Sequence, residues 1–161
     1  MDIDAGVITA LEYFKAKKSF NMDTEGRFEA MQEMLNELCD VCGIPILSFE
    51  MENIDGSFSG ASEFNSSEYK IVMRGKLSII TFLHEFAHAF FFHTVNFLYQ
   101  ESNQFNYYKI EQLAKMWSHH YFRKVYPRQY DKLMAARNGG TPDILPSIDE
   151  EPSDQGDLLH E

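Results

Sequence analysis

The stretch IITFLHEFAHAFFF, residues 79–92, places three ionisable side chains inside an apolar run. His84 and His88 are four residues apart, so on an α-helix they lie on one face, one turn from each other. Two imidazoles in this arrangement can both bind one tetrahedral zinc ion. Glu85 lies on the flank of the pair, where its carboxylate can reach a water held by the metal. The stretch therefore predicts a helix that carries a metal site.

The pattern also predicts a reaction. Zinc lowers the pKa of a bound water to about 7, and a carboxylate can then take its proton as the water attacks a carbonyl group. Glu85 is therefore the candidate catalytic residue of a hydrolase. The apolar surroundings favour this interpretation, because buried polar groups are costly unless they find partners, and a metal provides them. The alternative is a helix with two hydrogen-bonded histidines and a surface glutamate.

A third protein ligand is expected, since catalytic zinc usually takes three and leaves one position for water. It must come from an element that packs against the motif helix. The next predicted helix, about residues 107–125, can return antiparallel to it. Glu111 lies at the edge of the apolar stripe of that helix, next to Ala114, whose small side chain allows a close approach. The alternative third ligands are Glu101, His119 and His120.

The rest of the chain is typical of an α+β domain. Hydrophobic periodicity and turn signals predict helices over about 5–18, 24–42, 78–99 and 107–125, and a last one from Pro127 to Gly139-Gly140. The predicted strands are 46–51, 58–64 and 69–73. We expect a small three-stranded sheet, antiparallel or mixed, packed against the motif helix, with the Glu111 helix following. Asp23 or Thr24 can cap the second helix, and Gly43 can end it.

The net charge of −11 is unevenly distributed. Residues 141–161 hold seven acidic residues, no Lys or Arg and few apolar groups, which predicts a disordered tail after a single domain over 1–140. That domain is only mildly acidic, so we expect no nucleic-acid partner. No run approaches the roughly 20 apolar residues that span a membrane, and the N-terminus is acidic, unlike a secretory signal. These features predict a cytoplasmic protein without a membrane partner.

Several other residues have both a structural and a functional interpretation. Cys39 and Cys42 form a Cys-x-x-Cys pair, which can be a redox motif or half a zinc site, but their helical surroundings favour core packing. His93 lies roughly 180° around the helix from His84 and is expected to point away from the metal. Trp117 falls on an apolar stripe and is expected in the core. For Tyr99, Tyr107 and Tyr108 we expect aromatic packing, with donation to an oxyanion as the alternative.

The segment TFLHEFAH at 81–88, followed by Glu-Gln-Leu-Ala at 111–114, resembles the zincin peptidases of the gluzincin type. It is most similar to the compact ImmA/IrrE-like group of bacteria, phages and mobile elements, in which a strand leads into the motif helix and the next helix offers Glu-x-x-Ala. The resemblance covers about residues 57–125. An alternative within the superfamily is a SprT-like protein, with histidine as the third ligand.

The resemblance implies a zinc metallopeptidase in which His84, His88, Glu111 and a water bind one zinc ion. It also implies that Glu85 acts as general base and then passes the proton to the leaving amine. The implied substrate is a polypeptide, such as a transcriptional repressor or another regulatory protein. The hypothesis from another class is a non-catalytic, zinc-stabilised binding or regulatory module from a phage or mobile element. Glu85 argues against that module, because a structural zinc site does not need this carboxylate.

Overall fold

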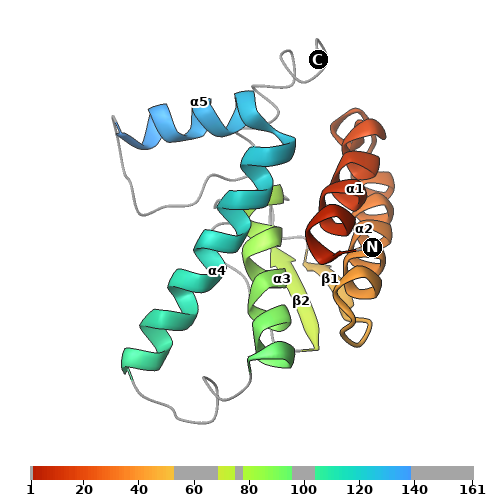
Figure 1. The fold of residues 1–161 in the computed structure, drawn as a ribbon. Helices are drawn as coiled ribbons and strands as arrows, with labels where there is room; N and C mark the ends of the chain where they lie inside the picture. The colour runs from red at the N-terminus through yellow and green to blue at the C-terminus, as the bar shows by residue number, and fades with distance from the viewer. Residues whose placement is uncertain (1, 53–68, 75–77, 96–103, 139–161) are drawn as a thin grey trace.

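Helices dominate the computed structural model, which describes residues 2–52, 69–74, 78–95 and 104–138 (Figure 1). The described part is a helix-rich α+β arrangement with a small sheet. The elements in chain order are α1 (Ile3–Ala16), the short 3-10 helix η1 (Ser19–Asn21), α2 (Thr24–Cys42), β1 (Ser48–Glu52), β2 (Lys70–Arg74), α3 (Ile79–Thr94), α4 (Gln104–Val125) and α5 (Pro127–Asn138). The expected helices are confirmed, with ends shifted by a few residues; the part of the third expected helix beyond 95 lies outside the described residues.

The ends of α2 follow from local chemistry. The Asp23 side chain accepts a hydrogen bond of 2.8 Å from the Gly26 amide, which satisfies one of the free amides at the start of a helix. At the other end Gly43 has a φ of 67°, a left-handed conformation that glycine adopts without steric cost. Both predicted boundary signals are therefore confirmed, with Asp23 rather than Thr24 as the cap.

The two described strands are parallel. Ser48 pairs with Lys70 and Glu52 with Arg74 at the two ends of the register. The expectation of a wholly antiparallel sheet is therefore wrong. A long connection between two strands does not fix their relative direction, whereas a tight hairpin would force them antiparallel. The remaining expected strand, at 58–64, lies outside the described residues. A mixed sheet therefore remains a prediction.

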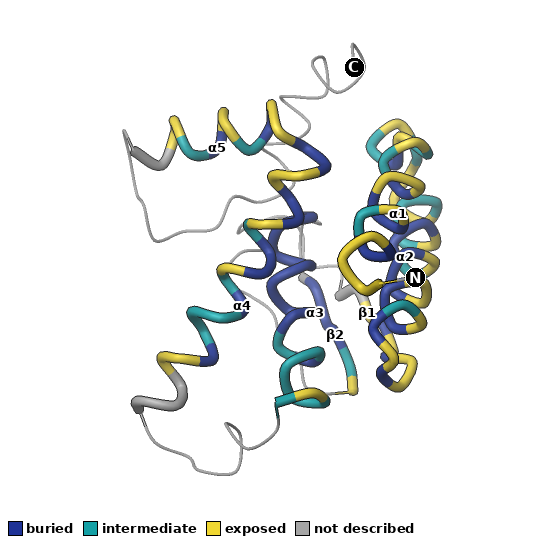
Figure 2. Tube along the Cα trace, in the orientation of Figure 1, coloured by how far each residue is buried: buried dark blue, intermediate teal, exposed yellow. Residues whose placement is uncertain are grey.

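The motif helix α3 lies between β2 and α4, and α3 and α4 run side by side in opposite directions (Figure 1). The first part of α3 is buried on nearly all sides (Figure 2), and Phe82, Leu83 and Phe86 have no exposed surface. Rings continue this core across the sheet: Phe49 stacks on Phe28 at 5.0 Å and meets Phe82 edge-on at 5.4 Å between centroids. The domain is therefore built around the helix that carries the motif.

Three residues with an open interpretation belong to the core, as expected. Trp117 is 9% exposed and packs between Phe86, at 5.5 Å, and Tyr121, at 4.6 Å between ring centroids. Cys39 and Cys42 are both buried, unbridged thiols. Burial raises the pKa of both thiols above the ordinary value. This is the opposite of what a redox-active cysteine needs.

Polar contacts connect the N-terminal helix with α4. The Tyr121 hydroxyl donates a hydrogen bond of 2.9 Å to the Asp4 carboxylate, and the Lys15 ammonium donates one of 2.8 Å to the Val125 carbonyl. α1 also packs against α2, which in turn contacts β1. α1 therefore supports the helix that faces the motif. Within the described residues, no helix combines the length and apolarity needed to cross a bilayer.

Candidate metal centre

The start of α3 explains why the motif lies inside the domain. Ser78 caps the helix, and its hydroxyl accepts a hydrogen bond of 3.3 Å from the Thr81 amide. The apolar residues that follow are driven into the interior between β2 and α4. His84 and Glu85 go with them and are only 5% and 4% exposed. Two ionisable side chains thus lie in the core, where they must be paired or bind a ligand.

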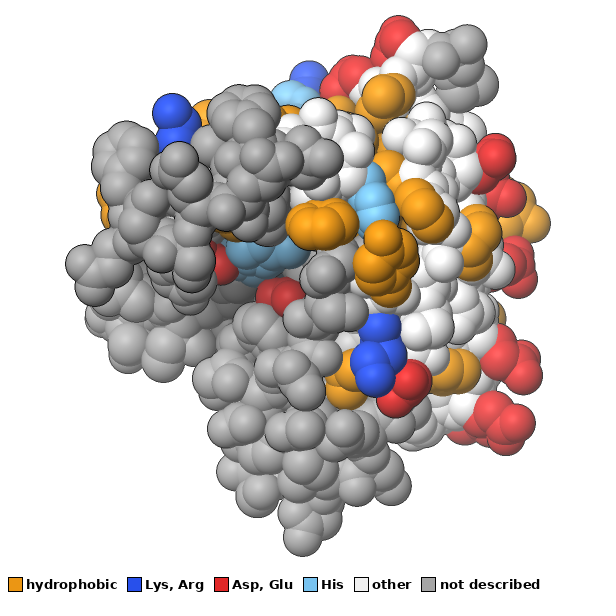
Figure 3. Space-filling view, turned by 90° about the horizontal axis from the view of Figure 1, so that it is seen from below, with side chains coloured by type: hydrophobic (Ala, Val, Ile, Leu, Met, Phe, Trp, Pro, Cys, Tyr) orange, Lys and Arg blue, Asp and Glu red, His pale blue; other side chains and the backbone are white. Residues whose placement is uncertain are grey.

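The motif side chains converge on one point. His84, Glu85 and His88 each offer one possible ligand atom, and these three atoms lie within 4.8 Å of one another. The two imidazole rings are 4.9 Å apart between centroids and inclined by 72°. Viewed from below, histidine and acidic side chains lie together in a hollow (Figure 3). This group could hold a metal ion.

Glu111 meets the two imidazoles from α4. One carboxylate oxygen, Oε1, lies 2.7 Å from His88 Nε2, and the other, Oε2, lies 3.3 Å from His84 Nε2. For comparison, two ligands of a tetrahedral zinc ion, each 2.0–2.1 Å from the metal, are about 3.3 Å apart. The spacing of the three residues is therefore close to what such an ion needs. The packing of α4 against α3 places Glu111 here; its role as a ligand stays a prediction.

The electrostatics of Glu111 agree with this arrangement. Hydrogen bonding with His84 and His88 holds the pKa of the Glu111 carboxyl well below its usual range, although partial burial opposes the shift. The Glu111 side chain is 36% exposed, whereas the side chains of His84 and His88 are 7% and 25% exposed. A carboxylate that stays ionised beside two imidazoles completes a nitrogen and oxygen donor set. Such a set suits zinc and other first-row transition metals that proteins bind.

Two of the alternative third ligands, His119 and His120, have contacts with α5 and α1. His119 Nδ1 lies 3.1 Å from the Tyr130 hydroxyl of α5. His120 Nε2 lies 3.7 Å from the Asp4 carboxylate of α1. These contacts lead away from His84 and His88 and give no support to a histidine as third ligand. Glu101 lies outside the described residues.

The remaining aromatic and histidine candidates lie in different surroundings. His93 packs its ring against Tyr69, at 5.2 Å, and Phe92, at 5.1 Å between centroids. Tyr108 is 65% exposed, so the expectation of aromatic packing is wrong for it. A position in the first turns of α4 leaves its ring on the solvent side. Tyr99 and the side chain of Tyr107 lie outside what the structure describes.

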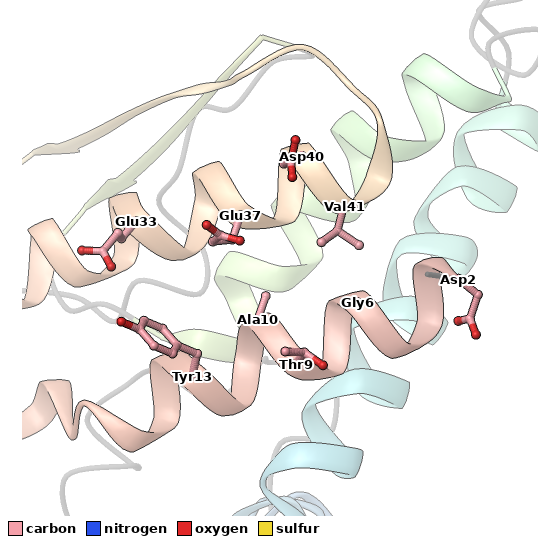
Figure 4. A pocket seen from close by; sticks show the side chains of 9 residues that line it. All are labelled: Asp2, Gly6, Thr9, Ala10, Tyr13, Glu33, Glu37, Asp40 and Val41. Carbon is pink, nitrogen blue, oxygen red and sulfur yellow. The ribbon is translucent and has the colours of Figure 1, made fainter.

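A second hollow, of about 610 Å³, lies between α1 and α2 (Figure 4). Its lining includes the carboxylates of Asp2, Glu33, Glu37 and Asp40. Lys17 forms an ion pair with Glu33 and lies 4.9 Å from the centre of the Tyr13 ring. The lining contains neither histidine nor cysteine. This groove is therefore distinct in chemistry from the candidate metal centre on α3 and α4.

Comparison of the chain with family models, with curated proteins and with solved structures finds no match in any of the three. The structure shows a buried His84-Glu85-His88 group on α3 with the spacing of the His-Glu-x-x-His pattern. The resemblance to the ImmA/IrrE-like group rests on the sequence motifs alone.

Proposed function

We propose that this protein is a zinc-dependent metallopeptidase. The observation that carries the proposal is the convergence of four side chains: the His84, Glu85 and His88 group within 4.8 Å, and the Glu111 carboxylate beside both imidazoles. Two histidines, one carboxylate ligand and one further carboxylate are what a hydrolytic zinc site needs. Burial of His84 and Glu85 excludes water from most of the group, which strengthens its electrostatic interactions.

His84, His88 and Glu111 are the residues that would hold the ion. When bound there, zinc would supply Lewis-acid chemistry, polarising a substrate carbonyl and making a water easier to deprotonate. Only a neutral imidazole has the free lone pair with which a histidine binds a metal ion. The site is built from two packed helices rather than from loops, which favours a fixed ligand geometry.

Glu85 is the proposed general base rather than a metal ligand. It follows His84 directly and lies roughly 100° around the helix from it, so its carboxylate flanks the ligand pair. It accepts a proton from the water that attacks the peptide carbonyl. It then donates this proton to the nitrogen as the carbon–nitrogen bond breaks, so that the products are a carboxylic acid and an amine. A polypeptide can reach the site in an extended form, as an added strand along a sheet edge.

The proposal is tested by metal analysis and by cleavage. Protein purified without added zinc should contain close to one zinc per chain. Incubation with a peptide library made from a bacterial proteome should give new termini, detected by mass spectrometry, that disappear after treatment with a chelator and return with zinc. A folded protein whose melting temperature does not respond to zinc would overturn the proposal.

The second candidate is a zinc-stabilised binding module without catalysis. It accounts for the His84, His88 and Glu111 cluster, but not for a buried carboxylate at Glu85 within reach of the same point. One zinc per chain, together with no cleavage of the library, would favour the module. Because a peptidase of narrow specificity can also be silent on a library, regulatory proteins from the same cell belong in the assay.

A further inference from the structure

Thr81 places a hydroxyl in the core that the helix itself does not satisfy. Its side chain has no exposed surface, and its Oγ1 atom has no hydrogen-bond partner among the described residues. A threonine within a helix can bond the carbonyl four residues back, as Thr94 bonds that of Phe90 at 2.8 Å. Thr81 is the third residue of α3, so the carbonyl four residues back precedes the helix. A buried hydroxyl without a partner is costly, which indicates a role beyond packing.

His84 has an unpaired atom on the same face of α3. Its Nε2 lies 3.3 Å from Glu111 Oε2, on the side of the ring that faces the candidate metal centre. The other ring nitrogen, Nδ1, is buried and has no hydrogen-bond partner within the part of the chain that the structure describes. Thr81 precedes His84 by three residues, so the two side chains are neighbours, roughly 60° apart around the helix. Helical side chains also lean toward the N-terminus, which directs the His84 ring over the turn that carries Thr81.

The His84 ring needs an acceptor at Nδ1 when it binds a metal through Nε2. An imidazole bound in this way carries its hydrogen on Nδ1, and that hydrogen normally donates to an oxygen, which orients the ring. Both His84 and Thr81 lie in the buried first part of α3 (Figure 2), where water has little access. The Thr81 hydroxyl can accept this hydrogen bond after rotation about the Cα–Cβ bond, because threonine has two favourable rotamers in a helix.

We propose that Thr81 is a positioning residue of the metal centre. Its hydroxyl accepts a hydrogen bond from the Nδ1–H group of His84 and holds the ring with Nε2 toward His88 and Glu111. One hydrogen bond then pairs both of the buried atoms. This inference rests on the proposed function, since it assigns a support to one ligand of that site.

The test compares Thr81→Val with Thr81→Ser in the full chain. Valine has nearly the shape of threonine without the hydroxyl, whereas serine keeps the hydroxyl. In competition with a zinc-binding dye, Thr81→Val should bind zinc roughly 10–100-fold more weakly than the parent protein, the usual effect of losing such a support. Thr81→Ser should retain most of the affinity. Thr94→Val is the matched control, because it makes the same change at an exposed position of α3, and it should bind zinc like the parent protein.

Thermal melting separates positioning from packing. In the presence of a chelator, Thr81→Val should melt no lower than the parent protein, because it removes a buried hydroxyl that has no partner. With zinc, the melting temperature of Thr81→Val should rise less than that of the parent protein, because weaker binding stabilises the folded state less. An equal lowering with and without zinc would show a packing role and overturn the inference.

Nitrogen-15 NMR of histidine-labelled protein reads the hydrogen bond directly. With zinc bound, the His84 ring should carry its hydrogen on Nδ1, in slow exchange with water in the parent protein and in Thr81→Ser, and in faster exchange in Thr81→Val. This measurement on the parent protein keeps the test valid if Thr81→Val does not fold, since a hydrogen on Nε2 or rapid exchange at Nδ1 would contradict the inference.

The outcomes distinguish this inference from the proposed function. If the parent protein binds zinc and Thr81→Val binds it equally well, or if Thr81→Ser loses as much affinity as Thr81→Val, only the role of Thr81 is wrong. If the parent protein binds no zinc, the proposed function fails, and this inference fails with it.

Discussion

Glu85 is the residue that separates a catalytic metal site from a structural one. We expect Glu85→Gln to keep one zinc per chain and to lose hydrolysis by roughly 10²–10⁴-fold, the usual contribution of a general base. The amide has nearly the same shape as the carboxylate but cannot accept the proton. The measurement is kcat/KM on a substrate identified from the library, with metal content determined on the same sample. Equal turnover by the variant and the parent protein would remove Glu85 from the mechanism.

Glu111 is the residue whose role depends most on tertiary structure. We predict that Glu111→Ala weakens zinc binding by more than the 10–100-fold typical of residues that only support a ligand. The variant leaves two imidazoles and no carboxylate of α4 beside them. Competition with a zinc-binding dye measures the affinity. His120→Ala is the control, since the described contact of His120 is with Asp4. If His120→Ala loses zinc while Glu111→Ala does not, the SprT-like alternative gains.

Among the elements, α2 carries the only two cysteines of the chain. If Cys39 and Cys42 have a structural role, we expect neither thiol to react with iodoacetamide in the folded protein at pH 8. Both are buried, and burial raises the pKa of Cys42 to about 12. A raised thiol pKa means that the reactive thiolate appears only at higher pH. Mass spectrometry should find no modification until denaturant is added, and two afterwards. Rapid labelling of the native protein would revive the redox interpretation.

The elements also show where sequence reasoning succeeds. Helix ends such as Asp23 and Gly43 depend on neighbouring residues alone, so local patterns predict them. Strand direction depends on the path of the connection, which local patterns do not contain. Periodicity predicts one buried stripe, but packing against both β2 and α4 buries Leu83 and Phe86 as well.

At the scale of the whole molecule, local sequence predicts one part of the site, and tertiary packing determines the other. The His84 and His88 pair with Glu85 follows from helical geometry, so a single segment is enough to predict it. Glu111 is 23 residues away from His88, and its approach depends on the antiparallel packing of α3 and α4.

The charge distribution of the chain suggests that its last part is dispensable for the metal centre. Residues 141–161 contain seven acidic residues and no Lys or Arg. From this composition we expect the segment to bury too little apolar surface to offset the entropy lost on ordering. Deletion of 141–161 should therefore leave the melting temperature and the zinc content unchanged. Differential scanning calorimetry with metal analysis measures both. The deletion removes no residue of α5, which ends at Asn138.

The apolar residues of this segment define the opposing outcome. Ile144, Leu145, Leu158 and Leu159 are among the apolar side chains that could dock on the domain. If the truncated protein melts several degrees lower, replacing the pair Ile144 and Leu145 or the pair Leu158 and Leu159 with serine in the full chain should reproduce the loss. A matched replacement of Asp149 and Glu150 with serine should not, because it changes charge without removing apolar surface. A loss of zinc on deletion would instead connect this segment with the metal centre.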